Sequence, residues 1–289
     1  MNWSRIYFSV SFPFGSVVTE EIWQVLVRFL HSQKALPAQF LMCQITGHPE
    51  HLKSEADLRL SPEEVERIII ERALTGFHVN TGYSGRSVVY SFGGGTLVCR
   101  IENKAKAAND WSGLLESCLT RFPGIGGWQV FWPYRTWQTL SKATDFGSAS
   151  TWGPLAPGYR TWHMPDPLEL RPGWTMLDTS LNPGRPKELA DGATFHPTAE
   201  MWLGPHFWQY AKCTKEEALA ADFWLETRET AHYSYFRCWP TAFTRPDGEQ
   251  GRMQQRLWKL FFHEDCEWPP GSGSICDEPM YGPPELMPS

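Results

Sequence analysis

The stretch WQVFWPYRTWQTLSKATDFGSASTWGPLAPGYRTWHMPDPLELRPGW, residues Trp128–Trp174, organises the chain around its middle. It holds six tryptophans in 47 residues, among prolines and glycines that interrupt helices and strands alike. Because so many large rings cannot remain in water, they must cover a core or line a contact surface. We therefore expect a long, irregular, Trp/Pro/Gly-rich segment in the middle of a single domain that spans residues 1–289.

The residues before this stretch are typical of regular structure. Residues 4–12 and 39–46 are rich in β-branched and aromatic side chains and predict strands. Two further β-type runs, 87–92 and 96–102, flank Gly93-Gly94-Gly95 and predict a hairpin. A glycine-rich phosphate loop is disfavoured there, because such a loop is followed by a helix and here a strand follows.

Three helices are predicted between these strands. Thr19 begins the first, and Asp110 caps the third, which precedes a strand at 128–132. The clearest start is Ser61-Pro62-Glu63-Glu64, where Ser61 and Glu64 can form a capping box, and we expect Gly76 to stop this helix. The order β-α-β-α-β-β-α-β predicts an α+β fold, a mostly antiparallel sheet with helices on one face.

The residues after the Trp-rich stretch predict a smaller set of elements. They are a short strand at 174–178, a strand from Glu200 to Tyr210 broken at Gly204-Pro205, a helix opened by a Thr214/Glu217 capping box, strands at 223–230 and 232–239, and a last helix at 249–262. Residues 1–132 and 174–262 are therefore possible subregions of the domain, and residues 263–289 form an acidic, Pro-rich tail.

The formal net charge of −6 comes from this tail. It has six acids and no Lys or Arg, whereas the other 262 residues carry 26 acids and 26 bases. A nucleic-acid partner is disfavoured, because binding phosphate backbones needs a basic face. The tail is either a solvated terminus or a partner-binding surface in which aromatic anchors supply binding energy and carboxylates supply steering. The candidate partner-binding residues are Glu264, Asp265, Glu267, Trp268, Asp277, Glu278 and Tyr281.

The start of the chain lacks the features of a signal peptide, and no apolar run reaches the roughly 18 residues that span a bilayer. We therefore expect a cytoplasmic protein with no membrane partner. The cysteines number seven, are widely spaced and form no C-x-x-C pair. This pattern predicts reduced, mostly buried thiols, and Cys238 reads as a core residue.

No catalytic, cofactor or metal motif is convincing. His48-x-x-His51, with Glu50 and Glu55 nearby, and His263-Glu264-Asp265-Cys266 have metal-binding residue types but lack a second cluster to complete a site. No G-x-S-x-G or nucleophilic cysteine signature is present. We predict that the protein is not an enzyme and has no cofactor.

The alternative is a motif-less hydrolase acting on a glycan or a small molecule. Sugar sites combine tryptophan rings with paired carboxylates, and several carboxylates of this chain lie near tryptophans in sequence. These are Glu200, Asp222, Glu226 and Glu229. Glu226 and Glu229 are three residues apart, so in a strand they face opposite sides of the sheet and do not converge.

The chain resembles the immunity proteins of bacterial toxin–immunity pairs. The likeness lies in the overall character: no signal peptide, the Trp-rich stretch Trp128–Trp174, and the end LWKLFFHEDCEWPPGSG, residues Leu257–Gly273. It implies a bacterial, cytoplasmic, non-enzymatic protein that binds a cognate toxin enzyme and blocks its active site. The acidity of the tail leads us to expect a toxin with a basic active-site cleft.

Overall fold

The computed structural model describes residues 6–46, 58–81, 88–101, 111–139, 161–163, 175–177, 179, 182–189, 193–244, 246 and 248–264. Most of the Trp-rich stretch, the proposed cap Asp110, the His48/His51 motif and residues 265–289 lie outside these ranges. Within the described ranges, no helix combines the length and the apolar character needed to cross a membrane.

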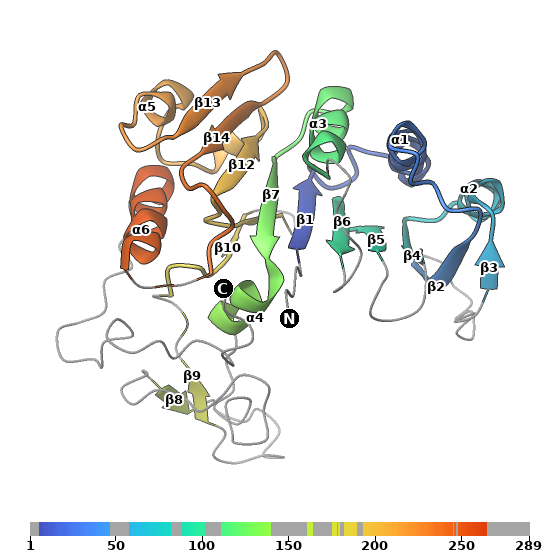
Figure 1. Ribbon diagram of the computed structural model, residues 1–289, viewed down its shortest axis with the longest axis horizontal. Coiled ribbons are helices and arrows are strands. Elements are labelled where there is room, and N and C mark those ends of the chain that lie inside the picture. Colours follow the sequence, from blue (N-terminus) through green and yellow to red (C-terminus); the bar gives the residue numbers. More distant parts are fainter. Residues whose placement is uncertain are drawn as a thin grey trace.

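A single ten-stranded sheet runs along the molecule (Figure 1). Its strands are β1 (Ile6–Ser11), β2 (Phe40–Thr46), β3 (Leu58–Leu60), β4 (Gly76–Asn80), β5 (Val88–Gly93), β6 (Thr96–Ile101), β7 (Gly126–Phe131), β12 (Glu200–Leu203), β13 (Glu226–Glu229) and β14 (Ser234–Arg237). The order is β13-β14-β12-β7-β1-β6-β5-β4-β2-β3, and every pairing is antiparallel. Two small antiparallel ladders pair β8 (Thr161–His163) with β9 (Thr175–Leu177) and β10 (Lys187–Glu188) with β11 (Thr194–Phe195). The α+β class and the antiparallel sheet are confirmed.

The helices are α1 (Thr19–Ser32), α2 (Pro62–Glu71), α3 (Trp111–Arg121), α4 (Trp132–Thr139), the 3-10 helix η3 (Phe207–Gln209), α5 (Lys215–Leu219) and α6 (Gly248–Phe262). Two of the helices, α2 and α5, begin at side-chain caps. Both predicted capping boxes form. At α2, the Glu64 N–H donates to Ser61 Oγ (3.2 Å) and the Ser61 N–H donates to the Glu64 carboxylate (2.7 Å). Thr214 and Glu217 make the same pair of bonds at α5.

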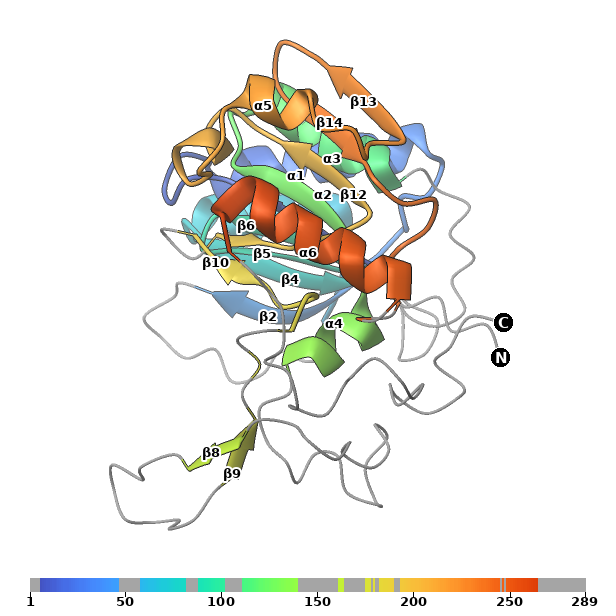
Figure 2. The same cartoon turned by 90° about the vertical axis from the view of Figure 1, so that its left-hand side faces the viewer.

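Two hydrophobic cores lie on opposite faces of the sheet. Phe8 and Val10 of β1 pack with α1, α2 and α3 on one face. Trp128 and Val130 of β7 point to the other face, because Ser9 rather than Phe8 is the partner of Trp128, and they pack with α6. The prediction that all helices lie on one face was therefore wrong. Helices α1–α3 do share one face, but α6 packs on the opposite face, over the part of the sheet that contains β7, β12 and β14 (Figures 1 and 2).

The end of α2 also differs from the prediction. The helix stops at Glu71 because the chain turns at Ala73, which has a left-handed φ of 46° and lets the Leu74 N–H donate to the Ile69 carbonyl (3.0 Å). Gly76, expected to stop the helix, instead begins β4, where an added Cβ would lie 2.5 Å from the Phe92 carbonyl oxygen. Neither β3 nor β4 was predicted, since each is short.

Part of the Trp-rich stretch is regular rather than irregular. The strand expected at 128–132 is β7, and its Trp128 side chain is fully buried. The next eight residues form α4, which was not predicted; Pro133 does not interrupt it, because proline is tolerated in the first turn of a helix. Trp132 of α4 stacks on Tyr7 with ring centroids 4.9 Å apart. The short strand expected near 174–178 is β9.

The second half joins the same sheet through β12, which pairs with β7. The strand predicted from Glu200 ends at Leu203, and η3 follows the expected break at Gly204-Pro205. Gly204 is required there, because an added Cβ would lie 2.2 Å from the carbonyl oxygen of Gly124. Along α6, Leu257, Trp258 and Phe261 face the core.

Candidate functional site

An apolar groove of about 660 Å³ opens at the ends of the strands, beside the loop after β1 and the β5–β6 turn. It is formed by residues of segments 14–20, 69–75 and 92–95, which are the loop after β1 with the first turn of α1, the end of α2, and the β5–β6 turn. We call it the end groove. Its size is typical of a small-ligand pocket or of the hollow that receives a few side chains of a protein partner.

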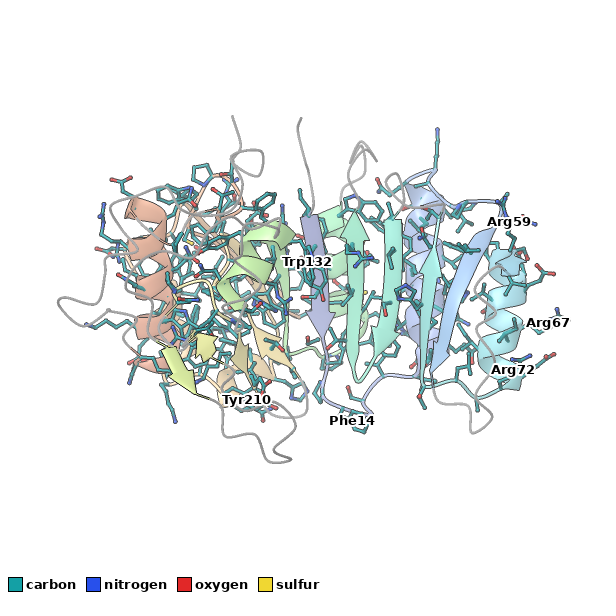
Figure 3. All side chains as sticks on the ribbon, turned by 90° about the horizontal axis from the view of Figure 1, so that it is seen from below. Phe14, Arg59, Arg67, Arg72, Trp132 and Tyr210 are labelled. Carbon is teal, nitrogen blue, oxygen red and sulfur yellow. The ribbon has the colours of Figure 1, made fainter. Side chains whose placement is uncertain are left out.

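Large apolar side chains are left in water around this groove. Phe14 is 71% exposed, Val18 60% and Ile70 52%, while Leu74 and Phe92 in the lining are buried. Figure 3 shows Phe14 standing off the end of the sheet. Among the described residues, the one other large hydrophobic side chain with comparable exposure is Leu225, at 56%, which does not line the groove. A gathering of exposed apolar groups is typical of a protein-interaction surface.

Local backbone structure holds these side chains outward. Phe14 sits in a turn in which the Ser16 N–H donates to the Pro13 carbonyl (3.0 Å) and Gly15 has a φ of 73°. On α2, Val65 and Ile69 face the core, and the 100° step to the next residue points Ile70 away from it.

The β5–β6 turn forms the opposite rim of the groove. Gly94 and Gly95 have φ values of 57° and 76°, which a two-residue hairpin turn requires, so the hairpin predicted at Gly93-Gly94-Gly95 is confirmed. The Phe12 N–H donates to the Gly95 carbonyl (2.8 Å) and ties this turn to the end of β1. The rim is thus held by backbone hydrogen bonds rather than by flexible side chains.

The end groove is poor in charge. Glu20 is the single charged side chain in its lining, and the Gln24 amide donates to the Glu20 carboxylate (3.2 Å). Next to it, Glu21 lies 3.8 Å from Arg121. With no second titratable group, the lining is not equipped for acid–base chemistry; it can bury apolar side chains of a ligand beside one negative charge.

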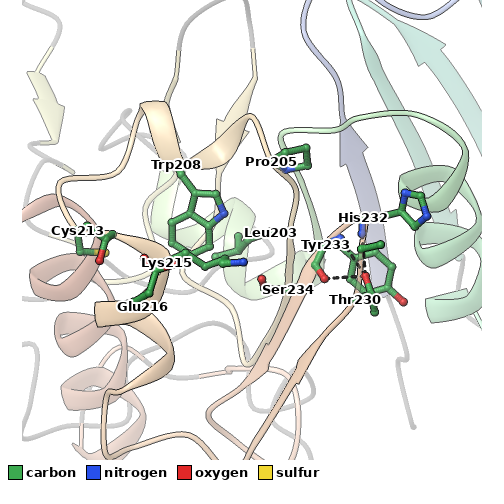
Figure 4. A pocket seen from close by; sticks show the side chains of 12 residues that line it. Leu203, Pro205, Trp208, Cys213, Lys215, Glu216, Thr230, His232, Tyr233 and Ser234 are labelled. Carbon is green, nitrogen blue, oxygen red and sulfur yellow. Dashed lines mark hydrogen bonds between the residues drawn. The ribbon is translucent and has the colours of Figure 1, made fainter.

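A second pocket of about 480 Å³ lies between the η3–α5 segment and the turn that joins β13 to β14 (Figure 4). Two of its polar side chains are already engaged. Lys215 pairs with Glu229, and the Thr230 hydroxyl donates to the Tyr233 carbonyl (2.8 Å). Burial, together with nearby Glu217, raises the pKa of the Cys213 thiol to about 11, so this cysteine is not an activated nucleophile.

Three of the four carboxylates that could serve glycan chemistry, Asp222, Glu226 and Glu229, are held in ion pairs. Asp222 pairs with Arg256 (2.5 Å), and Glu229 pairs with Lys215. Glu226 pairs with Arg237 at 2.9 Å, and Arg237 is also the cross-strand partner of Glu200. Glu200, Arg237 and Glu226 thus lie in one charged row across β12, β14 and β13 rather than as a pair of carboxylates that faces a substrate.

A buried polar cluster lies beneath α4 and α6. The Tyr134 hydroxyl donates to the Gln254 side chain (3.0 Å), and the Asn182 amide donates to the Gln138 carbonyl (2.8 Å). His196 is 5% exposed, lies edge-on to Trp128 and leaves its Nδ1 atom without a hydrogen-bond partner. Burial, and then the positive charge of Arg135, lower the pKa of His196 well below its usual value.

Glu264 is the one predicted tail residue within the described ranges. Its carboxylate pairs with Arg185 (3.2 Å) and Lys187, and the Arg185 guanidinium lies 3.8 Å from the centre of the Trp258 ring. Glu264 therefore fixes the root of the tail to the body of the protein. The other six lie outside the described residues: Asp265, Glu267, Trp268, Asp277, Glu278 and Tyr281.

Two sequence motifs, His48-x-x-His51 and His263-Glu264-Asp265-Cys266, have residue types that can bind a metal ion. His48 and His51 fall outside the described residues, as do Asp265 and Cys266 of the second motif. Within the part of the chain that the structure describes, no three His, Cys, Asp or Glu side chains are grouped to hold a metal ion.

Comparison with known proteins gives little further information. No protein family model matches the chain, and no curated protein matches it. Among solved structures, the Pseudomonas aeruginosa T6SS protein PA0821 is similar over 91% of this chain and 74% of that chain, with 8% sequence identity and a TM-score of 0.48. At this level the similarity carries no argument about function.

Proposed function

We propose that the protein is a non-enzymatic binding protein that docks on a protein partner through the end groove. In its specific form, it is an immunity protein that neutralises a cognate toxin enzyme by blocking the active site. The observation that carries the proposal is the gathering of Phe14, Val18 and Ile70 around one groove. The resemblance of the sequence to immunity proteins supports the choice of partner.

Physical arguments favour this use of the groove. Apolar surface removed from water contributes about 25 cal/mol per Å², and aromatic side chains such as that of Phe14 are enriched at protein interfaces. The backbone hydrogen bonds that order the turn at Phe14 and the β5–β6 hairpin reduce the conformational entropy that is lost on binding. In the proposed complex, Glu20 and the acidic tail meet a basic cleft of the toxin and speed association.

The first experiment recovers the partner and tests inhibition directly. The tagged full-length protein is used to capture proteins from its native host, and the product of the neighbouring reading frame is tested alongside. The partner is then purified, its enzymatic activity is measured, and inhibition by this protein is titrated. The proposal predicts stoichiometric inhibition of an enzyme that is toxic when expressed alone.

Matched variants connect inhibition to the groove. Phe14→Ser and Ile70→Ser each remove an exposed apolar anchor, and we expect inhibition to weaken about tenfold or more. Leu225→Ser removes an equally exposed apolar side chain away from the groove and should leave inhibition unchanged. If Leu225→Ser weakens inhibition as much as Phe14→Ser does, or if neither groove variant has an effect, the end groove is not the binding site.

The tail has a separate test. Deleting residues 265–289 should slow association and flatten its dependence on salt, because the tail carries the excess negative charge. An unchanged association rate and salt dependence would contradict the steering role of the tail but leave the groove proposal intact. Turnover of a glycan or small molecule by the purified protein, without any stable protein partner, would support the hydrolase alternative instead.

A further inference from the structure

Another groove, of about 530 Å³, lies along α6 and is lined mainly by basic and apolar side chains. Its lining holds three cationic side chains, Lys212, Arg256 and Lys259, against one carboxylate, Glu217. The 262 residues before the tail carry 26 acids and 26 bases, so this lining is a local excess of positive charge. We call it the basic groove; its other lining residues are Cys213, Phe223, Leu260 and His263.

The basic side chains come from two separate segments that the fold brings together. Arg256, Lys259 and His263 follow the spacing i, i+3, i+7 and therefore line one side of α6 and its end. Lys212 precedes α5, and its N–H donates to the Phe261 carbonyl (2.6 Å), which holds it beside the end of α6. Figures 1 and 2 show α5 beside α6.

The dipole of α6 alone does not explain this cluster of basic side chains. Cations near the end of a helix interact favourably with its dipole, which accounts for Lys259. Arg256 lies about two turns before the end, and Lys212 belongs to another segment. Arg256 is also held in place, because it pairs with Asp222 (2.5 Å) and its guanidinium lies 4.4 Å from the centre of the Phe223 ring.

The opposing carboxylate is partly occupied. Glu217 accepts the Thr214 N–H (2.7 Å) in the capping box of α5, and this bond holds the pKa of Glu217 below its usual range. Glu217 therefore stays ionised, and together with Asp222, which pairs with Arg256, it offsets two of the three positive charges and leaves an excess of one. Glu264 does not fill it either, since its carboxylate pairs with Arg185 and Lys187, which stack on Trp258 and Phe262 rather than on the groove side of α6.

The spacing of the bases indicates the shape of the ligand. From Arg256 to its last residue, Phe262, α6 rises about 9 Å, at 1.5 Å per residue, and His263 follows directly. A single small anion cannot contact bases spread over that length. An extended peptide advances about 3.3 Å per residue, so three or four residues span it and place alternate side chains on the same side. Phe223 and Leu260 offer an apolar floor for one side chain between the charges.

We propose that the basic groove binds an acidic peptide segment of a partner protein, in which carboxylates flank an apolar side chain. This site is distinct from the end groove, and no residue lines both. It therefore does not depend on the proposed immunity function, and the two can fail independently.

The test uses synthetic peptides and the full-length protein. A fluorescein-labelled peptide EELEEE is titrated by fluorescence anisotropy, with QQLQQQ and EESEEE as controls for charge and for the apolar side chain. We expect saturable binding of EELEEE, weaker binding of EESEEE and none of QQLQQQ. Binding should weaken when ionic strength rises from about 0.05 M to about 0.5 M, because salt screens exposed charges.

Charge-matched variants locate the site. Lys259→Gln and Arg256→Gln should each weaken binding of EELEEE about fivefold. Arg252→Gln removes the same charge from the same helix, at a side chain that is 68% exposed and outside the groove, and should leave binding within about twofold. Thermal unfolding of each variant checks that the fold is intact.

Three results would overturn the proposal. They are the absence of saturable binding of EELEEE, equal binding of QQLQQQ, and equal losses in Arg252→Gln and Lys259→Gln. The last result would mean that the peptide responds to the overall charge of α6 rather than to the groove.

Discussion

The buried His196 should make the protein sensitive to mild acid. The ring is 5% exposed, and burial together with Arg135 holds its pKa well below the usual value, so the folded protein keeps it neutral. In the unfolded chain, histidine titrates near pH 6.5. Above that pH both states are neutral and stability is fully present. As the pH falls below about 6.5, only the unfolded chain binds the proton, and stability is lost.

The size of the effect follows from this difference. Because the folded protein keeps His196 neutral, proton binding to the unfolded chain alone lowers the free energy of unfolding, by about 2 kcal/mol at pH 5. Replacing His196 by Phe, which keeps an aromatic ring against Trp128, removes this contribution. His196→Asn gives a second, smaller neutral replacement.

Urea unfolding followed by tryptophan fluorescence tests this prediction. The free energy of unfolding is measured near pH 7.5 and near pH 5 for the natural sequence, His196→Phe and the exposed-site control His232→Phe. The natural sequence and the control should lose about 2 kcal/mol more between the two pH values than His196→Phe does. Any cost of repacking is the same at both pH values and cancels. Equal losses in all three proteins would refute the reasoning, since His196 would then titrate alike in both states.

Three further predictions concern stability and reactivity. Gly204→Ala should destabilise the protein by about 1–3 kcal/mol in urea unfolding, because the new Cβ would collide with the backbone of Gly124. An unchanged urea midpoint would contradict this close approach of the two backbone segments. Ser61→Ala should cost about 1 kcal/mol by removing the oxygen that accepts the Glu64 N–H, whereas Ser61→Asp should retain most of the stability. Burial raises the pKa of Cys118 to about 12, so peptide mapping after maleimide treatment should find this thiol modified in urea but not in the native protein; rapid native labelling would argue against its burial.

Much of the secondary structure could be predicted because its causes are local. A capping box such as Ser61/Glu64 is made within three residues, and a tight hairpin needs only glycines such as Gly94 and Gly95 with positive φ. The hydrophobic spacing of α1 likewise marks its buried face without reference to the rest of the fold. The missed elements include α4 and the strands β3, β4, β8, β10 and β11, all of which are short, and their signals are weaker than those of the residues around them.

The candidate sites could not be predicted in the same way. In the run Ile68-Ile69-Ile70 all three side chains are equally apolar, and only the placement of α2 decides that Ile69 is buried while Ile70 is 52% exposed. Lys212 carries no sequence signal that links it to α6, which begins 36 residues later. Of the predicted tail residues, Glu264 is described, and its ion pairs with Arg185 and Lys187 depend on a segment far away in the sequence.

The sequence by itself determined the α+β class, most helix starts, the hairpin and the concentration of negative charge in the tail. Tertiary structure alone decided the strand order, in which β12 joins β7, and placed α6 on the face opposite α1–α3. The physical reason is that periodicity shows that a segment has an apolar side, but not which surface will cover it. That choice depends on packing between distant segments, and it created both the end groove and the basic groove.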